Sequence, residues 1–180
     1  MNPSAKWLPF DADAILHRIE YAGRVCYRSQ TKDNPSAFVR RLVASGHESV
    51  LEHCSLSAEI VCSRACSHQI VRHRLCAYSQ ESQRYVNYSK QGYDIIGDFD
   101  CSQAITQYEQ LLAEGRKPEE ARSVLPNCMA TRLVMTTNLR QWRHIFKERA
   151  LNPHAQNEIR GLFKHLLDTV GLEDVFYDLR

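Results

Sequence analysis

The stretch Met129-Ala130-Thr131-Arg132-Leu133-Val134-Met135-Thr136-Thr137 decides the fold class, because its side chains alternate between two faces as in a β-strand. Leu133 and Met135 fall on one face, whereas Arg132 falls on the other. Residues 56–62 alternate in the same way, with an apolar residue at every second position. These two stretches therefore predict two strands of a sheet.

Segments outside these strands carry the periodicity and the capping residues of helices, with Asp11 or Asp13 as the expected N-cap of the first helix and Asn138 as that of a later one. The predicted helices span residues 11–24, 36–45, 63–73, 103–114, 118–124, 138–150 and 153–167. A loop is predicted over residues 76–83, and short strands are predicted at residues 84–87 and 93–96. Because helices outnumber strands, we predict an α+β fold with a small mixed sheet flanked by helices, in a single domain of residues 1–180.

The composition is that of a soluble globular protein, with 43% hydrophobic and 24% charged residues and a net charge of +2. Such a small charge excess argues against a general nucleic-acid or membrane binder. No apolar run approaches the roughly 20 residues of a membrane-spanning helix, and the first residues lack the apolar core of a signal peptide. The seven cysteines are irregularly spaced, which predicts reduced thiols in a cytoplasmic protein and no metal site.

Two segments concentrate polar side chains: residues 47–53, and residues 69–74 with their continuation to residue 85. The planar guanidinium of arginine pairs with two phosphate oxygens, so the stretch 69–85 can seat more than one anionic group. A solvated helix face is the competing interpretation of the triplet Arg72-His73-Arg74. No glycine-rich nucleotide loop is present, so side chains and helix ends would have to hold a flavin or nucleotide.

Further arginines form a second basic set, for which ion pairs with Glu119, Glu120 or Glu148 are the structural alternative. Its members are Arg122, Arg132, Arg140, Arg143 and Arg149. Cys76 lies in the polar segment beside arginines that could activate a thiol, but a buried or unreactive thiol is the better interpretation.

The spacing from Arg72-His73-Arg74 to Ser82, followed by Gln83-Arg84-Tyr85, resembles the signature of flavin-dependent thymidylate synthases. Further landmarks of that family occur in the same order, at residues 46–49, 52–53, 121–126, 137–140 and 154–158. The similarity covers roughly residues 22–160. The segment 7–10 resembles only a remnant of the strand that usually leads the family's sheet.

The resemblance implies a homotetramer of the thymidylate synthase-complementing type. It would convert dUMP to dTMP with FAD, NADPH and 5,10-methylenetetrahydrofolate, and it would bind neither nucleic acid nor membrane. Arg149 would be the catalytic residue, stabilising charge on the pyrimidine.

By the same resemblance, two sets of residues would hold the two nucleotides. The dUMP set is Gln69, Arg72, Gln80, Ser82, Gln83, Arg84, Arg122 and Arg149. The FAD set is Cys26, Ser49, Glu52, Arg72, His73, Arg74, Gln80, Asn138, Arg140 and His144. The alternatives are a non-catalytic nucleotide- or RNA-binding module that uses Arg72-His73-Arg74, and a zinc-stabilised protein.

Overall fold

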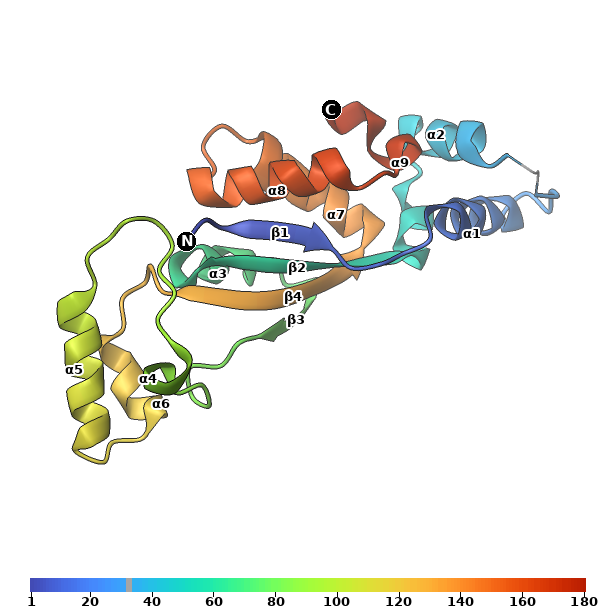
Figure 1. Cartoon of the computed structure of the whole chain (residues 1–180). Helices are drawn as coiled ribbons and strands as arrows, with labels where there is room; N and C mark the ends of the chain where they lie inside the picture. The colour runs from blue at the N-terminus through green and yellow to red at the C-terminus, as the bar shows by residue number, and fades with distance from the viewer. Residues whose placement is uncertain (32–33) are drawn as a thin grey trace.

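A four-stranded sheet in the order β1-β2-β4-β3 forms the centre of the protein (Figure 1). The computed structural model describes residues 1–31 and 34–180. The strands are β1 (Ser4–Trp7), β2 (Ser55–Ser63), β3 (Ala77–Gln80) and β4 (Ala130–Asn138). The two strands predicted from alternation are thus confirmed as β2 and β4, and they pair along their whole length, from Ser55 opposite Asn138 to Ser63 opposite Ala130.

The sheet is antiparallel throughout, so the predicted mixed sheet was wrong. The reason lies in the connections. After β1 the chain passes through helices at one end of the sheet and enters β2 from that same end, which makes β2 run back along β1. The segment that connects β3 to β4 likewise leaves the sheet and returns to it at the same end. The helical connections therefore join antiparallel strands and are not parallel crossovers.

One face of the sheet is buried under helices, and the other is only half-buried or exposed. Leu56, Ile60, Leu133 and Met135 point into the core. The covering elements are α3 (Arg64–Ile70), α7 (Leu139–Ile145), the π-helix η3 (Phe146–Leu151) and α8 (Asn157–Thr169). The buried residues of α8 recur at helical spacing, which fits a helix with one apolar face on the sheet.

Two helices extend from one end of the sheet. They are α1 (Ala12–Val25), capped by Asp11, and α2 (Ser36–Ala44), and the 3-10 helix η1 (Glu48–His53) leads from them into β2. The C-terminal α9 (Glu173–Phe176) and the 3-10 helix η4 (Tyr177–Leu179) lie beside α2, where Arg40 pairs with Asp174 at 3.1 Å.

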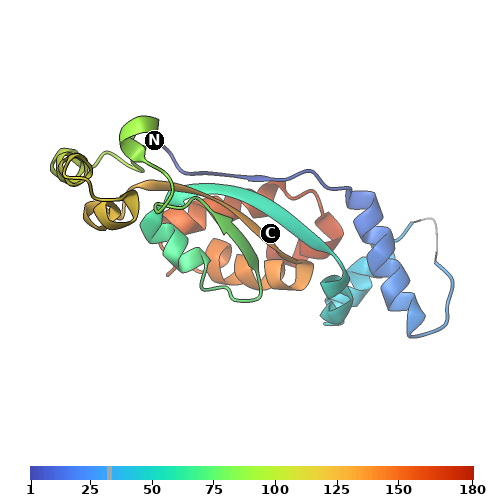
Figure 2. The same ribbon diagram turned by 90° about the horizontal axis from the view of Figure 1, so that it is seen from below.

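A separate lobe lies at the opposite end of the sheet from α1 and α2 (Figures 1 and 2). It contains α4 (Tyr88–Gln91), α5 (Ser102–Ala113), α6 (Pro118–Ala121) and the 3-10 helix η2 (Arg122–Val124). Tyr88, Tyr108, Ala121 and Met129 form its own small hydrophobic cluster. None of the described helices is long and apolar enough to cross a membrane.

The leading strand, expected only as a remnant, is present as β1. Its Trp7 packs against Trp142 with ring centroids 4.8 Å apart, and the Trp7 indole donates to the Leu166 carbonyl at 3.0 Å. Lys6 on the other face pairs with Glu59 of β2 at 3.2 Å. These contacts hold a short strand whose own sequence is too brief to show alternation.

Other local predictions need correction. The predicted loop at 76–83 contains β3, whose polar residues reflect an edge strand with one open face. The segment 84–87 forms no strand, and only Ile95 bridges to Met129 within the other predicted short strand. The last long helix begins at Asn157 instead of Pro153, because Asn152 Oδ1 accepts from the His154 backbone N–H and holds a turn there.

Candidate active site

His73 and Arg149 meet at the centre of the candidate site, although they are far apart in sequence. Arg149 Nε donates to His73 Nε2 at 3.0 Å, and the His144 ring lies 6.1 Å from the His73 ring. His73 follows α3, which ends at Ile70 and so excludes both Arg72 and His73 from the predicted helix. The Tyr78 hydroxyl of β3 fixes this segment by donating to the carbonyls of Ile70 and His73, at 2.8 and 2.9 Å.

The His73 side chain is neutral at physiological pH. Burial lowers the pKa of His73 to about 4, assisted by the nearby Arg149 and His144 and opposed by Glu148. Only 8% of the residue is exposed. A neutral imidazole accepts a hydrogen bond at one nitrogen, so His73 orients Arg149 without neutralising its positive charge.

Arg72 and Arg74 flank His73 on the exposed surface. Neither makes an ion pair with any residue in 1–31 or 34–180. Their guanidinium groups therefore stay available for an external anion, and the segment concentrates positive charge beside Arg149.

Ser82, Arg84 and Arg122 gather where the sheet joins the lobe. Arg84 pairs with Glu119 at 3.1 Å, and Arg122 Nε donates to the Glu119 backbone carbonyl at 3.2 Å. The Arg84 backbone N–H donates to Ser82 Oγ at 3.3 Å. Glu119 thus pairs with Arg84, which lies outside the basic set for which the ion-pair alternative was considered, whereas Arg122 of that set makes no ion pair among the described residues.

The glutamines of the predicted site are held by short side-chain contacts. Gln80 donates to Ser67 Oγ and Thr131 Oγ1, both at 3.1 Å, and Gln69 donates to Gln156 at 2.5 Å. Gln83 is 9% exposed. Gln80 therefore lies on the covered side of the sheet, between α3 and β4.

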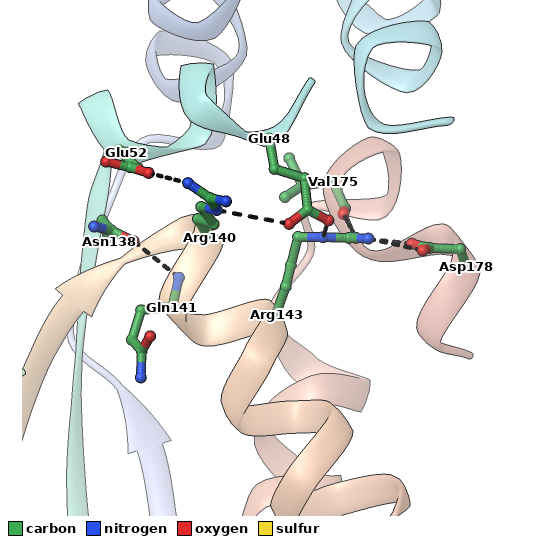
Figure 3. A network of polar contacts seen from close by, with 8 residues as sticks. All are labelled: Glu48, Glu52, Asn138, Arg140, Gln141, Arg143, Val175 and Asp178. Carbon is green, nitrogen blue, oxygen red and sulfur yellow. Dashed lines mark hydrogen bonds and ion pairs between the residues drawn. The ribbon is translucent and has the colours of Figure 1, made fainter. Parts of the chain in front are cut away.

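A charged network joins η1, α7 and the C-terminus (Figure 3). Arg140 pairs with Glu52 at 2.5 Å, so two residues of the predicted FAD set contact each other. Arg143 pairs with Glu48 at 2.9 Å and with Asp178 at 2.7 Å, and it also donates to the Val175 carbonyl. The hydrogen bonds from Arg143 hold the pKa of Asp178 below its ordinary value.

Asn138 begins α7 within the same network, because its side chain accepts from the Gln141 backbone N–H at 2.8 Å (Figure 3). Ser49 is exposed in η1. Cys26 is also exposed, at the C-terminal end of α1.

Glu158 belongs to the family landmark at residues 154–158, but the sequence did not predict a role for it in the site. Its two carboxylate oxygens accept from the backbone N–H and the hydroxyl of Ser63, each at 2.7 Å, which fixes the turn from β2 into α3. The thiols of Cys62 and Cys66 lie within 4.8 Å of this carboxylate. Hydrogen bonding to Cys62 and burial raise the pKa of the Cys66 thiol. No local signal reveals the contact, because Ser63 and Glu158 are 95 residues apart.

Comparison with known protein families shows which family this chain belongs to. The family model described as "Thymidylate synthase complementing protein" matches residues 12–173. The chain belongs to this family. The match includes all of the residues predicted for the dUMP and FAD sites.

Curated members of the thymidylate synthase complementing family support the same assignment. The chain is 38% identical over 197 aligned residues to a protein of Mycobacterium sp. (strain JLS) named "Flavin-dependent thymidylate synthase". That alignment covers 89% of this chain and 77% of the relative. A protein of the same name from Mycobacterium tuberculosis (strain ATCC 25177 / H37Ra) is also 38% identical, over 89% of this chain and 76% of its own length.

In this family member the predicted site residues fall into separate groups. The lobe group contains Arg84 and Arg122, whereas the network of Glu52 and Arg140 lies near α1, at the other end of the sheet (Figures 1 and 3). β2 has nine residues, and a strand of that length spans about 30 Å. A single chain therefore does not bring all of the predicted residues to one place.

Proposed function

We propose that the chain is a flavin-dependent thymidylate synthase, which converts dUMP to dTMP with 5,10-methylenetetrahydrofolate as carbon donor and FAD and NADPH for the reduction. Membership of the family and the names of its relatives support this activity. The structural observation that carries it is the charged Arg149 held by a neutral His73 beside the unpaired Arg72 and Arg74. The non-catalytic RNA-binding alternative is not favoured.

The donor set near His73 fits the phosphates of FAD. Arg72 and Arg74 expose two guanidinium groups without acidic partners among the described residues, and a diphosphate accepts bidentate hydrogen bonds from such groups. In our proposal, His73 and His144 lie beside these arginines, and Asn138 and Arg140 hold another part of the cofactor. When bound, FAD carries reducing equivalents from NADPH to the one-carbon unit.

Arg149 is proposed to be the catalytic residue. Negative charge develops on the pyrimidine carbonyl and N3 as C5 of dUMP becomes nucleophilic enough to accept the one-carbon unit, and a fixed guanidinium stabilises that charge. His73 contributes by orienting Arg149, because the Nε–H of Arg149 donates to His73 Nε2. Because His73 is neutral, it neither repels the guanidinium nor removes its charge.

The lobe group is proposed to hold the dUMP phosphate. Ser82 and Arg122 supply a hydroxyl and a guanidinium there, and Glu119 anchors Arg84 and Arg122 in one orientation. We propose that Gln80, between Ser67 and Thr131, lies between the two nucleotides, with Gln69 and Gln83 beside dUMP.

We further propose a homotetrameric, cytoplasmic enzyme with one domain per chain and no nucleic-acid partner. The separation of the lobe group from the Glu52–Arg140 group supports self-association, because a second copy can bring one group next to the other. Cys26, which is exposed at the end of α1, would then reach the cofactor of another chain. Sedimentation analysis tests this proposal: a tetramer is expected, and an active monomer would contradict it.

Binding of FAD tests the cofactor site. The purified protein, incubated with FAD, should quench flavin fluorescence and retain the flavin after gel filtration. Arg72→Gln combined with Arg74→Gln should weaken this binding, whereas Arg132→Gln, an exposed substitution on β4, should not. An unaltered flavin affinity in the double variant would contradict the placement of the phosphates.

A further inference from the structure

Two cysteines of the lobe lie in direct contact. The Sγ atoms of Cys101 and Cys128 are 3.3 Å apart. Cys101 is the N-cap residue of α5, and Cys128 lies two residues before β4. A disulfide bond is about 2.05 Å long, so the two sulfurs need a further approach of only roughly 1 Å to become bonded.

This contact lies at the joint between the lobe and the sheet. The Ile96 backbone N–H donates to the Cys128 carbonyl at 2.9 Å, and Ala130 N–H donates to the Asp94 carbonyl at 2.8 Å. Met129, between them, pairs with Ile95. The backbone of Cys128 is thus fixed, while Cys101 begins the helix that forms the outer part of the lobe (Figure 1).

Only one of the two thiols is accessible. Cys128 is half-buried and lines a cavity of about 450 Å³, together with Gly97, Phe99 and Asn127. Cys101 is 8% exposed and does not line that cavity. Burial and the contact with Cys128 raise the pKa of the Cys101 thiol. A small reagent that enters the cavity therefore meets the sulfur of Cys128 first.

We propose that Cys101 and Cys128 form a thiol–disulfide modification site for low-molecular-weight disulfides. The Cys128 thiolate attacks one sulfur of the reagent, the reagent's S–S bond breaks, and a mixed disulfide forms as one reagent thiol leaves. Cys101 then attacks the Cys128 sulfur and displaces the second reagent thiol. The two protein thiols lose two electrons to the reagent, and their two protons end on the two reagent thiols.

The disulfide would link the start of α5 to the segment that leads into β4. Residues 101–128 form the closed loop and contain α5, α6 and η2. Glu119 and Arg122 belong to this loop and contact Arg84 through the pairing and hydrogen bond described above. The disulfide between Cys101 and Cys128 would therefore restrain the segment that anchors Arg84. Reduction of this disulfide would remove the restraint.

Another close cysteine pair in the protein lacks this access. Cys62 and Cys66 are both fully buried, at 0% exposure, in the core beneath the sheet. Reaction with a reagent in solution depends on access as well as on thiolate character. Of these two pairs, only Cys101 and Cys128 include a cysteine that a reagent can reach, so Cys62 with Cys66 serves as an internal control.

The experiment uses the reduced full-length protein and oxidised glutathione as the probe. After incubation, free thiols are alkylated without reduction and the protein is digested with trypsin. The expected product joins the tryptic peptide 91–116, which contains Cys101, to the peptide 123–132, which contains Cys128. Cys62 and Cys66 should be recovered as free thiols once the protein is unfolded in the presence of the alkylating reagent. Recovery of both lobe cysteines as free thiols, or a bond in the core pair instead, would overturn the proposal.

Single variants test the order of attack. Cys101→Ser should leave a stable mixed disulfide of glutathione on Cys128, because no second thiol can displace it. Cys128→Ser should leave Cys101 unmodified, and Cys76→Ser should behave like the unaltered protein. Glutathione on Cys101 of the Cys128→Ser protein, with none on Cys128 of the Cys101→Ser protein, would contradict the assignment. Far-UV circular dichroism establishes that each variant is folded, and all readouts are independent of the proposed enzymatic activity.

Discussion

Arg149 Nε donates to His73 Nε2 across 3.0 Å and thereby joins the π-helix η3 to the segment that follows α3. The contact exists only while His73 is neutral, because an imidazolium has no acceptor nitrogen. The low pKa of His73, about 4, and its burial are therefore part of the arrangement that orients Arg149.

The first prediction concerns stability and pH. The pKa of His73 is about 4 in the folded protein, below its ordinary value of 6.5. Between these values the unfolded chain binds the proton and the folded protein does not, so the free energy of unfolding falls as the pH decreases. The total loss of unfolding free energy caused by His73 is about 3 kcal/mol, and no such loss occurs above the ordinary histidine pKa. His73→Gln retains an acceptor but cannot titrate, so its urea-unfolding free energy should fall less over this window.

The control for that measurement is His165→Gln, which replaces an exposed histidine of α8. The unfolding free energy of this variant should still fall between about pH 6.5 and pH 4 as in the unaltered protein, because His73 is present. If His73→Gln and the unaltered protein lose stability in parallel between about pH 6.5 and pH 4, then His73 is not the neutral group inferred here.

The second prediction separates the two half-reactions. Arg149→Lys keeps a positive charge but loses the planar fork and the Nε–H that reaches His73. It should slow the reoxidation of reduced flavin by dUMP and methylenetetrahydrofolate, while flavin reduction by NADPH changes little. Rapid-mixing absorbance measurements follow each half-reaction. Slowing of flavin reduction alone would show that Arg149 acts elsewhere.

The third prediction concerns Ser82. Its hydroxyl is half-buried and close to Arg84, where it is proposed to contact dUMP. Ser82→Ala should weaken dUMP binding about tenfold to a hundredfold, which corresponds to roughly 1–3 kcal/mol for a lost hydrogen bond to a charged group. The matched control is Ser79→Ala, an exposed substitution on β3. Equilibrium binding measures the dUMP affinity of each variant, and equal affinities would refute a contact between Ser82 and dUMP.

The fourth prediction uses the network of Figure 3. Arg143 is 2% exposed, and its loss leaves Glu48, Asp178 and the Val175 carbonyl without their donor. Arg143→Met should therefore cost about 3–5 kcal/mol of unfolding free energy. Arg140→Met removes an ion pair whose side chains are 54% and 46% exposed, and should cost much less, because solvent screens the pair. Urea unfolding compares the two, and similar losses would contradict a structural role for Arg143.

The sequence predicted β2 and β4 well, because each is long and has one buried face that alternates with a half-buried one. It predicted α1 and the start of α7 through their caps, Asp11 and Asn138, which act locally. β1 and β3 each have only four residues and depend on contacts with the rest of the sheet, such as Trp7 with Trp142. Period-2 alternation is not visible in so short a segment.

For the candidate site, the residue types were visible but their partners were not. The signature identified Arg72, His73 and Arg149 through family resemblance, yet the bond between His73 and Arg149 joins residues 76 positions apart. The predicted Arg84 and Arg140 already have acidic partners in Glu119 and Glu52, which only the fold brings near. Whether Cys26 and Ser49 contact FAD stays a prediction.

The most direct test of the proposed function measures tritium release from C5-labelled dUMP. The purified protein is incubated with labelled dUMP, FAD, NADPH and 5,10-methylenetetrahydrofolate, and dTMP is identified chromatographically. Release of tritium with formation of dTMP is predicted, and it should require all four components. A folded protein that binds FAD and dUMP but releases no tritium and forms no dTMP under these conditions would contradict the assignment.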